Sequence, residues 1–266
     1  MEAALGTKVR YEAADGTARI TLCSPGDGNS INPQMAAELL AAIRRAKADD
    51  ARVVVLSAEG RAFCVGGDIR SFSSADNVED FLDDLAEGLH HAVSELYRMN
   101  AIVVSAVAGV AAGAGVALAA AADIVLAAQS AKFTLAYTGI GFSPDGGTSL
   151  LTASLGLHRT LHMALLNPKL SAEEAQAAGL VAEVHPDDEL PAAVEKVVST
   201  LLAGSRTAQV ATKRLLREQA TPLPEGALRK ETLSIRSCAA SPDGQEGVAA
   251  FLGKRPPQFP SGQPAK

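Results

Sequence analysis

The sequence RAFCVGGDI at Arg61–Ile69 and the sequence AVAGVAAGAG at Ala106–Gly115 decide the fold of this chain. Each stands at the end of a continuous apolar run, Val53–Ser57 in the first case and Ile102–Val107 in the second. Such runs are typical of strands that are buried on both faces. Glycine and alanine let the backbone turn sharply and let another group approach closely. The two stretches therefore predict close-packed loops at the ends of buried strands.

Strands and helices alternate on both sides of these stretches. Val9–Glu12 and Ala18–Leu22 flank the turn signal Asp15-Gly16 and predict a β-hairpin. Further strands are expected at residues 124–127 and 132–135, and helices at residues 33–48, 78–99, 148–155, 158–166, 171–178, 190–202 and 205–219. The polar stretch 71–80 is expected to be a mobile loop, and residues 256–266 are expected to fray. The order predicts an α/β protein that ends in a helical region.

Composition narrows the class of protein. The 266 residues are 47% hydrophobic and 20% charged, which suits a folded globular chain. A net charge of −6 argues against nucleic acid as a partner. Cys23, Cys64 and Cys238 lie far apart, so neither a disulfide framework nor a metal site is expected, and a reducing, cytoplasmic location is predicted. The first eleven residues lack the apolar core of a signal peptide.

One apolar segment has two interpretations. Residues 101–122 are long enough to span a bilayer as a helix. They are rich in alanine and glycine, however, and Gly109 interrupts them. A buried strand followed by a small-residue helix explains the segment better, so we expect no membrane partner.

Three motifs in this order resemble the crotonase family of enoyl-CoA hydratases and isomerases. They are Arg61–Ile69, Ala106–Gly115 and Gly141–Thr148, which reads GFSPDGGT. Weaker similarity occurs at residues 178–181 and 251–255, and the resemblance extends from Val9 to Phe259. It implies a crotonase-like spiral core of repeated ββα units at residues 1–200. It also implies a C-terminal helical trimerisation region and tail at residues 201–266, and a homotrimer or hexamer.

The resemblance further implies an oxyanion hole made by the backbone N–H groups of Gly67 and Ala114. An acyl thioester becomes acidic at its α-carbon only when its enolate oxygen is stabilised, and two fixed donors in a dry site do this efficiently. Ala114 also stands near the expected start of an apolar helix, where unpaired N–H groups favour negative charge. The alternative is that these residues only turn and pack. A dinucleotide loop is disfavoured, because the spacing is not Gly-x-Gly-x-x-Gly.

The carboxylates decide the reaction. Hydratases of the family use two glutamates, and the matching positions here are Ala117 and Tyr137. This departure puts ordinary hydratase activity in doubt. Asp145 is the replacement candidate: a single carboxylate in an apolar pocket can take a proton from one carbon and return it to another. The alternative is that Asp145 caps a helix that begins near Gly146.

Other residues have structural and functional interpretations side by side. His90 and His91 are expected to be packed or exposed rather than to face the site. Asp68 is expected to fix its loop through backbone hydrogen bonds, and Cys64 to be a small buried filler. Tyr137 either lines the acyl pocket or donates a hydrogen bond.

Coenzyme A enters as part of the substrate, and no separate cofactor is expected. The resemblance implies contacts with the thioester in three regions: the loop that begins at Ser24, the segment around Arg61–Ile69, and the C-terminal residues Phe251 and Lys254. In the second region the expected binding residues are Ala62, Cys64, Val65, Asp68 and Ile69. The family often supplies the third region from a neighbouring subunit. Where many relatives carry a basic residue in the first region, this chain has Asp27-Gly28.

Three functions follow as hypotheses. The first is an enoyl-CoA isomerase with Asp145 as the proton shuttle. The second is a hydratase or another enolate-forming enzyme, including acyl-CoA hydrolysis or dehalogenation. The third is a catalytically weak subunit that binds acyl-CoA.

Overall fold

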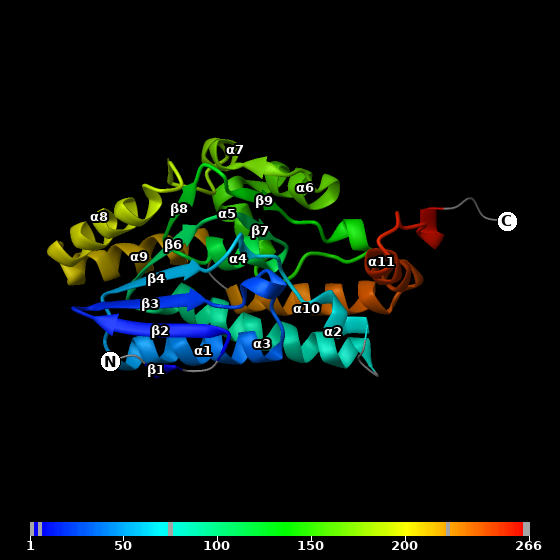
Figure 1. Cartoon of the computed structure of the whole chain (residues 1–266), viewed down its shortest axis with the longest axis horizontal. Helices are drawn as coiled ribbons and strands as arrows, with labels where there is room; N and C mark the ends of the chain where they lie inside the picture. The colour runs from blue at the N-terminus through cyan, green and yellow to red at the C-terminus, as the bar shows by residue number, and fades with distance from the viewer. Residues whose placement is uncertain (1–2, 5–6, 74–76, 222–223, 263–266) are drawn as a thin grey trace.

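The computed structural model describes residues 3–4, 7–73, 77–221 and 224–262. These residues form two β-sheets with helices packed around them (Figure 1). The larger sheet has the strand order β1-β2-β3-β4-β6-β8-β11, and the smaller sheet has the order β10-β9-β7-β5. The α/β architecture with two sheets is therefore confirmed.

The larger sheet begins with the predicted hairpin. Its strands are Ala3–Ala4 (β1), Val9–Ala14 (β2), Thr17–Leu22 (β3), Val53–Ala58 (β4), Ile102–Val107 (β6), Ile124–Ala128 (β8) and Glu183–His185 (β11). Strands β2 and β3 are antiparallel, and Asp15 and Gly16 join them with φ angles of 50° and 78°. From β3 to β11 every neighbouring pair is parallel. The apolar runs that predicted buried strands thus lie in the middle of the sheet.

The smaller sheet repeats the same chain path. It consists of Ala62–Cys64 (β5), Val110–Ala112 (β7), Lys132–Thr134 (β9) and Leu170–Ser171 (β10). Strands β5, β7 and β9 pair in parallel, and each follows one strand of the larger sheet in the chain. Because β4–β5 and β6–β7 each lead into helices, the repeated ββα pattern is present.

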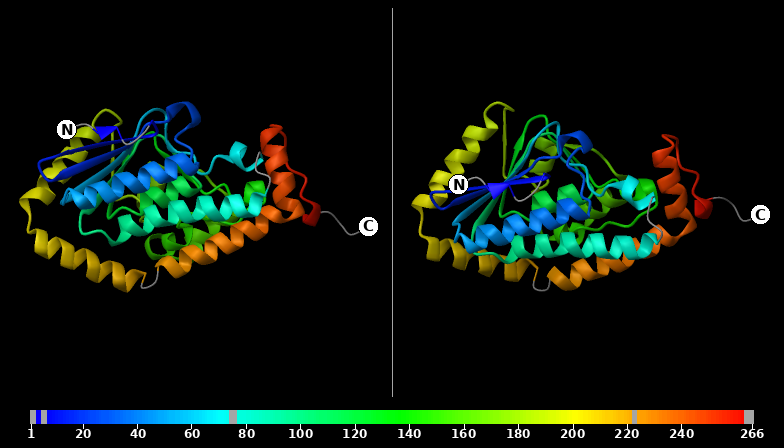
Figure 2. Two further views of the ribbon diagram at one scale, coloured as in Figure 1. Left: turned by 90° about the horizontal axis from the view of Figure 1, so that it is seen from below. Right: turned by 60° about the horizontal axis from the view of Figure 1, so that its bottom comes forward.

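Three long helices form the layer below the larger sheet. They are Pro33–Ala48 (α1), Val78–Arg98 (α3) and Pro224–Ala240 (α10), and α3 packs against both of the others (Figure 2). The other helices are Ile69–Ser73 (α2), Ala114–Ala120 (α4), Thr152–Leu155 (α5), Leu157–Leu166 (α6), Ala172–Ala177 (α7), Leu190–Ala203 (α8), Arg206–Ala220 (α9) and Pro242–Leu252 (α11). Short 3₁₀ turns occupy Pro25–Asp27 (η1), Thr138–Ile140 (η2), Thr148–Leu151 (η3) and Pro260–Gly262 (η4).

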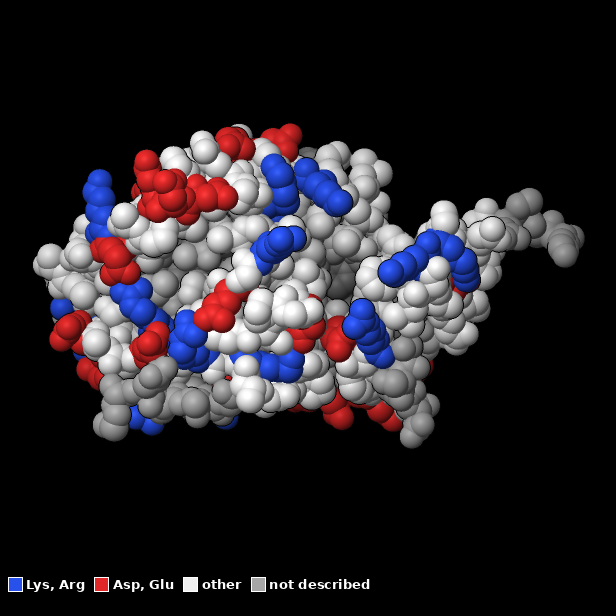
Figure 3. Space-filling model, in the orientation of Figure 1, with Lys and Arg blue, Asp and Glu red and all other residues white. Residues whose placement is uncertain are grey.

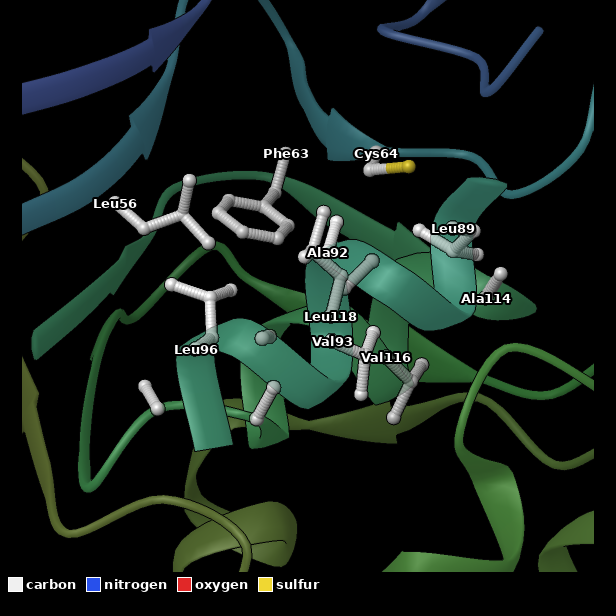
Figure 4. Close-up of a cluster of buried hydrophobic side chains, with 14 of the residues drawn as sticks. Leu56, Phe63, Cys64, Leu89, Ala92, Val93, Leu96, Ala114, Val116 and Leu118 are labelled. Carbon is white, nitrogen blue, oxygen red and sulfur yellow. The ribbon is translucent and has the colours of Figure 1, made fainter. Parts of the chain in front are cut away.

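The core holds the short helix α4 in place. Leu89 and Val93 of α3 lie close to Val116 and Leu118 of α4, with Phe63 of β5 nearby (Figure 4). All five side chains are buried in one hydrophobic cluster. Burial of a leucine or valine side chain contributes about 1.5–3 kcal/mol. The start of α4 is therefore fixed against α3 and β5.

The apolar segment at residues 101–122 divides into a strand and a helix, as expected. Its first part is β6 and its last part is α4. Within the described ranges, none of the helices has the length and apolar character needed to cross a bilayer.

Three expectations about the chain path need correction. Residues 71–80 are not one loop, because α2 continues to Ser73 and α3 begins at Val78 behind the cap Asn77; residues 74–76 lie outside the described part. The helix expected at residues 148–155 is divided into η3 and α5. Helices α10 and α11 were not predicted individually from the sequence.

The third correction concerns the C-terminal segment. Asp243 and Glu246 of α11 accept hydrogen bonds from residues that follow the helix: Ser261 N–H donates to Asp243 at 3.0 Å, and Gln258 N–H donates to Glu246 at 2.7 Å. The segment up to Gly262 is therefore attached to α11, and residues 263–266 lie outside the described part.

Candidate active site

Two loops bring Gly67 and Ala114 to one cavity. Ile31 N–H donates to Gly66 O at 2.8 Å, and Asp68 N–H donates to Ile31 O at 2.9 Å. These two hydrogen bonds are made by Gly66 and Asp68, the residues on either side of Gly67. Neither bond uses the Gly67 N–H. Ala114 is the first residue of α4, and an N–H at this position has no partner within its own helix. Both residues line the same cavity.

Glycines allow these loops to approach each other. Gly66 has φ +89°, and a Cβ on it would lie 3.0 Å from Ala112 O. A Cβ on Gly115 would lie 2.2 Å from Cys64 O, closer than any side chain tolerates. The glycine pattern of the two motifs is thus explained by direct backbone packing between β5 and the start of α4.

The cavity has a volume of about 710 Å³ and opens beside α11. Its apolar wall is formed by side chains from α2, α3, η2, α10 and neighbouring loops: Ile69, Phe72, Leu82, Leu85, Ala86, Leu89, Leu135, Ile140, Phe142 and Ile235. Phe72 stacks on Phe142 with ring centroids 6.1 Å apart. Asp27, Ser30, Asp68 and Arg70 lie on its polar side. On the face shown in Figure 3, Lys and Arg side chains border the hollow between the body of the molecule and α11.

Asp145 is a buried acid on the wall of this cavity. Asp145 is 7% exposed to solvent. The Tyr137 and Thr148 hydroxyls donate to the Asp145 carbonyl oxygen at 2.8 and 2.9 Å, which fixes the backbone. Asp145 Oδ1 lies 2.8 Å from His90 Nε2, an ion-pair distance, although the two atoms do not meet the angles of a linear hydrogen bond. His90 is thus both packed and in contact with the site, whereas His91 is exposed.

The helix-cap interpretation of Asp145 is wrong. Gly147 occupies the cap position of η3, and no side chain caps that turn. The N–H groups of Gly147 and Ser149 donate instead to the two carboxylate oxygens of Glu231, both at 2.7 Å. Glu231 belongs to α10 and is 6% exposed. It was missed because no local motif marks a contact between residues more than 80 positions apart.

His90, Asp145 and Glu231 form one buried cluster. Each offers a ligand-type atom, and these atoms lie within 4.8 Å of one another. Both Glu231 oxygens accept backbone N–H groups, and His90 faces Asp145 directly. Burial, and then the neighbouring Asp145, raise the pKa of Glu231. Burial also raises the pKa of the Tyr137 hydroxyl well above its ordinary value, so this phenol stays neutral.

Several expectations for the first motif agree with the geometry. The Asp68 carboxylate accepts the Arg70 N–H at 3.2 Å and the Ser71 hydroxyl at 2.8 Å, so it fixes its loop. Cys64 is fully buried, and burial raises the pKa of its thiol to about 12. Tyr137 lines the cavity and also donates a hydrogen bond, so both of its interpretations hold.

The residues expected to contact coenzyme A divide into two groups. Val65, Asp68, Ile69 and Phe251 line the cavity, whereas Ser24, Ala62, Cys64 and Lys254 are not part of its wall. Phe251 of the chain's own α11 lines this cavity.

Lys8 supplies a positive charge to the loop that begins at Ser24, the first of the three regions expected to contact coenzyme A. Lys8 Nζ lies 2.9 Å from Ser24 Oγ and 2.9 Å from Asp27 Oδ2. The contact was missed because Lys8 precedes the hairpin and is 16 residues from Ser24.

Ala117, which matches one hydratase glutamate, lies behind the site. It lines a second cavity of about 530 Å³ between α4 and α9, and it is not part of the first cavity's wall. Tyr137, at the other glutamate position, has no carboxylate to offer. Neither position can supply the paired acids of a hydratase.

Comparison with known proteins agrees with this geometry. A family model described as enoyl-CoA hydratase/isomerase matches residues 12–262. The chain is 41% identical to a probable enoyl-CoA hydratase of Rhodobacter capsulatus, covering 94% of this chain and 97% of the relative. It is 35% identical to the 1,2-epoxyphenylacetyl-CoA isomerase of Escherichia coli, covering 92% and 95%.

A solved structure described as an enoyl-CoA hydratase from Mycobacterium avium subsp. paratuberculosis superimposes with a TM-score of 0.86 at 34% identity, covering 95% of this chain and 98% of that one. The chain belongs to the enoyl-CoA hydratase/isomerase family. It is an enzyme of this family with the crotonase fold.

Proposed function

We propose that this protein is an enoyl-CoA isomerase in which Asp145 moves a proton between two carbons of the acyl chain. The observation that carries the proposal is the position of Asp145, a buried carboxylate on the wall of the cavity that contains Gly67 and Ala114. The cavity has two other acids, but Asp27 pairs with Lys8 and Asp68 holds its own loop. Asp145 therefore is the acid available for chemistry at the acyl carbons.

The proposed reaction needs one base and one oxyanion hole. The Asp145 carboxylate removes a proton from the α-carbon of a 3-enoyl thioester, and the electron pair moves onto the thioester oxygen. The N–H groups of Gly67 and Ala114 stabilise this dienolate, and loss of one such donor typically costs about 10²–10³ in rate. Asp145 then returns the proton to the γ-carbon, which gives the conjugated 2-enoyl thioester. Atoms and charge balance without a cofactor.

His90 supports the proposed role of Asp145. Its Nε2 lies 2.8 Å from Asp145 Oδ1, so the imidazole is placed to orient the carboxyl group. The 35% identical isomerase of Escherichia coli supports the reaction class, although it is named for a different substrate, 1,2-epoxyphenylacetyl-CoA.

Hydration is the second candidate, because the 41% identical relative is named a probable enoyl-CoA hydratase. The residues Ala117 and Tyr137 argue against it, since hydratase chemistry needs two groups to activate water. Product analysis separates the two. Purified protein given 3-enoyl-CoA should form 2-enoyl-CoA, and given 2-enoyl-CoA in water should form little 3-hydroxyacyl-CoA. Rapid hydration would replace the isomerase proposal, and binding of acyl-CoA without turnover would favour a binding subunit.

We further propose that the protein assembles as a homotrimer or a pair of trimers. Leu157, Leu161 and Leu165 stand four residues apart on α6 and are 59%, 43% and 62% exposed. An exposed apolar stripe of this kind is typical of an interface.

A further inference from the structure

Two adjacent residues of helix α10 contact the surroundings of Asp145: Glu231 contacts the loop that follows Asp145, and Thr232 contacts His90 of α3. Glu231 accepts the N–H groups of Gly147 and Ser149, which follow Asp145 in the chain. Thr232 contacts His90 Nδ1 through its hydroxyl at 3.2 Å. The two contacts therefore act on Asp145 indirectly, one through the backbone of its loop and one through the imidazole of His90.

The backbone after Asp145 needs an external acceptor. Gly146 and Gly147 have φ angles of +74° and +102°, so neither continues a helix. A Cβ on Gly146 would lie 2.7 Å from Ala114 Cβ, which places this turn directly against the start of α4. A buried N–H without a partner destabilises the folded state. Glu231 supplies the acceptor for both N–H groups, and its own helix packs along α3.

The second contact gives His90 Nδ1 a hydrogen-bonding partner, and the roles of the two atoms depend on the tautomer of the imidazole. Thr232 has one hydroxyl proton, and Leu228 O lies 3.3 Å from its oxygen as an acceptor. When Thr232 donates to Leu228, its oxygen accepts from His90 Nδ1–H. His90 Nε2 then faces Asp145 Oδ1.

Resting on the proposed function, we propose that Glu231 is a positioning residue for Asp145. Its carboxylate holds the loop of Asp145 in its reactive position, and its negative charge acts on the Asp145–His90 pair. The ionisable groups around Asp145 are His90 on α3, Glu231 on α10 and Tyr137 before η2. Glu231 provides the second buried carboxylate of this set.

Three variants separate the two parts of the proposal. Glu231→Gln removes the charge and one acceptor, whereas Glu231→Asp keeps the charge on a shorter side chain. Glu225→Gln is the matched control, because Glu225 stands on the same helix and pairs with Arg98 at the surface. The measurements are kcat and KM for 3-enoyl-CoA isomerisation from acid to alkaline pH. Amide hydrogen exchange of Gly147 and Ser149 provides a readout that does not depend on activity.

For Glu231→Gln we expect kcat to fall about tenfold to hundredfold, because the reactive group is displaced, with KM within about threefold. The pH–rate profile should move to lower pH by on the order of one unit, since an anion next to the pair is gone. Both amides should exchange faster. Glu231→Asp should speed exchange and lower kcat without moving the profile, and Glu225→Gln should match wild type in all three.

A Glu231→Gln variant with the wild-type pH profile and wild-type exchange would overturn the proposal. If Glu231→Gln does not fold, Glu231→Asp with unchanged amide exchange overturns it instead. A wild-type protein that isomerises no enoyl-CoA would refute the proposed function alone. The exchange rates would then still decide whether Glu231 holds the loop.

Discussion

At the scale of single residues, the site is defined by where a few polar groups are buried. Asp145, His90 and Glu231 are each less than a tenth exposed and lie together beside an apolar cavity. Buried charges are costly unless they are paired, so clusters of this kind are typical of functional sites. The motif around Asp145 could be found in the sequence. His90 and Glu231 could not be assigned, because only the packing of α3 and α10 brings them to Asp145.

His90 should therefore affect the chemistry and His91 should not. We expect His90→Gln to lower kcat by about tenfold to a hundredfold, since contacts with a charged group contribute about 1.5–3 kcal/mol. The exposed neighbour provides the control variant, His91→Gln. Steady-state kinetics of both variants with 3-enoyl-CoA will check this. If the two variants are equally active, His90 does not take part in the chemistry.

At the scale of elements, the sequence predicted the pieces that carry their own local signals. The hairpin appeared where Asp15-Gly16 indicated, and α1 has the predicted bounds. Ser171 forms a capping box with Glu174 at the start of α7, where a helix was predicted at residues 171–178. The prediction of a loop at residues 71–80 was wrong because the polar composition concealed α2, whereas the start of α3 at Val78 was predicted. Composition describes solvent exposure better than it describes backbone conformation.

The contact between β5 and α4 should tolerate no added side chain. Gly115→Ala places a methyl group against Cys64 O, and overpacking of this kind costs about 1–3 kcal/mol of stability. The same shift moves the Ala114 N–H, so kcat should fall by a larger factor than stability alone explains. Gly226→Ala is the control, because a Cβ there meets nothing within 4 Å. Thermal unfolding and kinetics measured together should show a loss of stability and a fall in kcat for Gly115→Ala. Gly226→Ala should show neither.

The free energy of unfolding of the protein should depend on pH through Glu231. Its folded-state pKa is raised by burial, so its favourable contribution is present below the ordinary carboxyl pKa and is lost as the pH rises through the folded-state value. Glu231→Gln stays neutral and shows no such loss. The unfolding free energy of wild type minus that of Glu231→Gln should therefore decrease as the pH rises above the ordinary carboxyl pKa of about 4. An increase over this range in denaturant titrations would contradict the assignment.

At the scale of the whole molecule, loops that follow the strands and side chains of α2, α3, α10 and α11 line a cavity with a polar side and an apolar wall. Fold and family could be predicted because three glycine-containing motifs stand in a fixed order. Phe251 was expected from the family resemblance and does line the cavity. Glu231 could not be predicted, because it reaches the site only through the packing of α10 on the core. The assembly likewise depends on surfaces such as the leucine stripe of α6.

That stripe gives a test of the proposed trimer. Light scattering should give a mass of three or six copies of the 27.3 kDa chain. Leu161→Asp should dissociate the assembly, because it places a charge in an apolar interface. Arg159→Asp changes charge on the same helix away from the stripe and should leave the mass unchanged. A monomeric wild-type protein would contradict the proposal.

The most direct test of the proposed reaction compares wild type with Asp145→Asn. The measurement is the rate at which 3-enoyl-CoA becomes conjugated 2-enoyl-CoA, followed by the absorbance of the conjugated thioester. Because the amide cannot take up a proton, we expect kcat to fall by a factor of about 10²–10⁴. KM should change little, since the oxyanion hole and the apolar wall are intact. Full isomerase activity in Asp145→Asn would contradict the central claim.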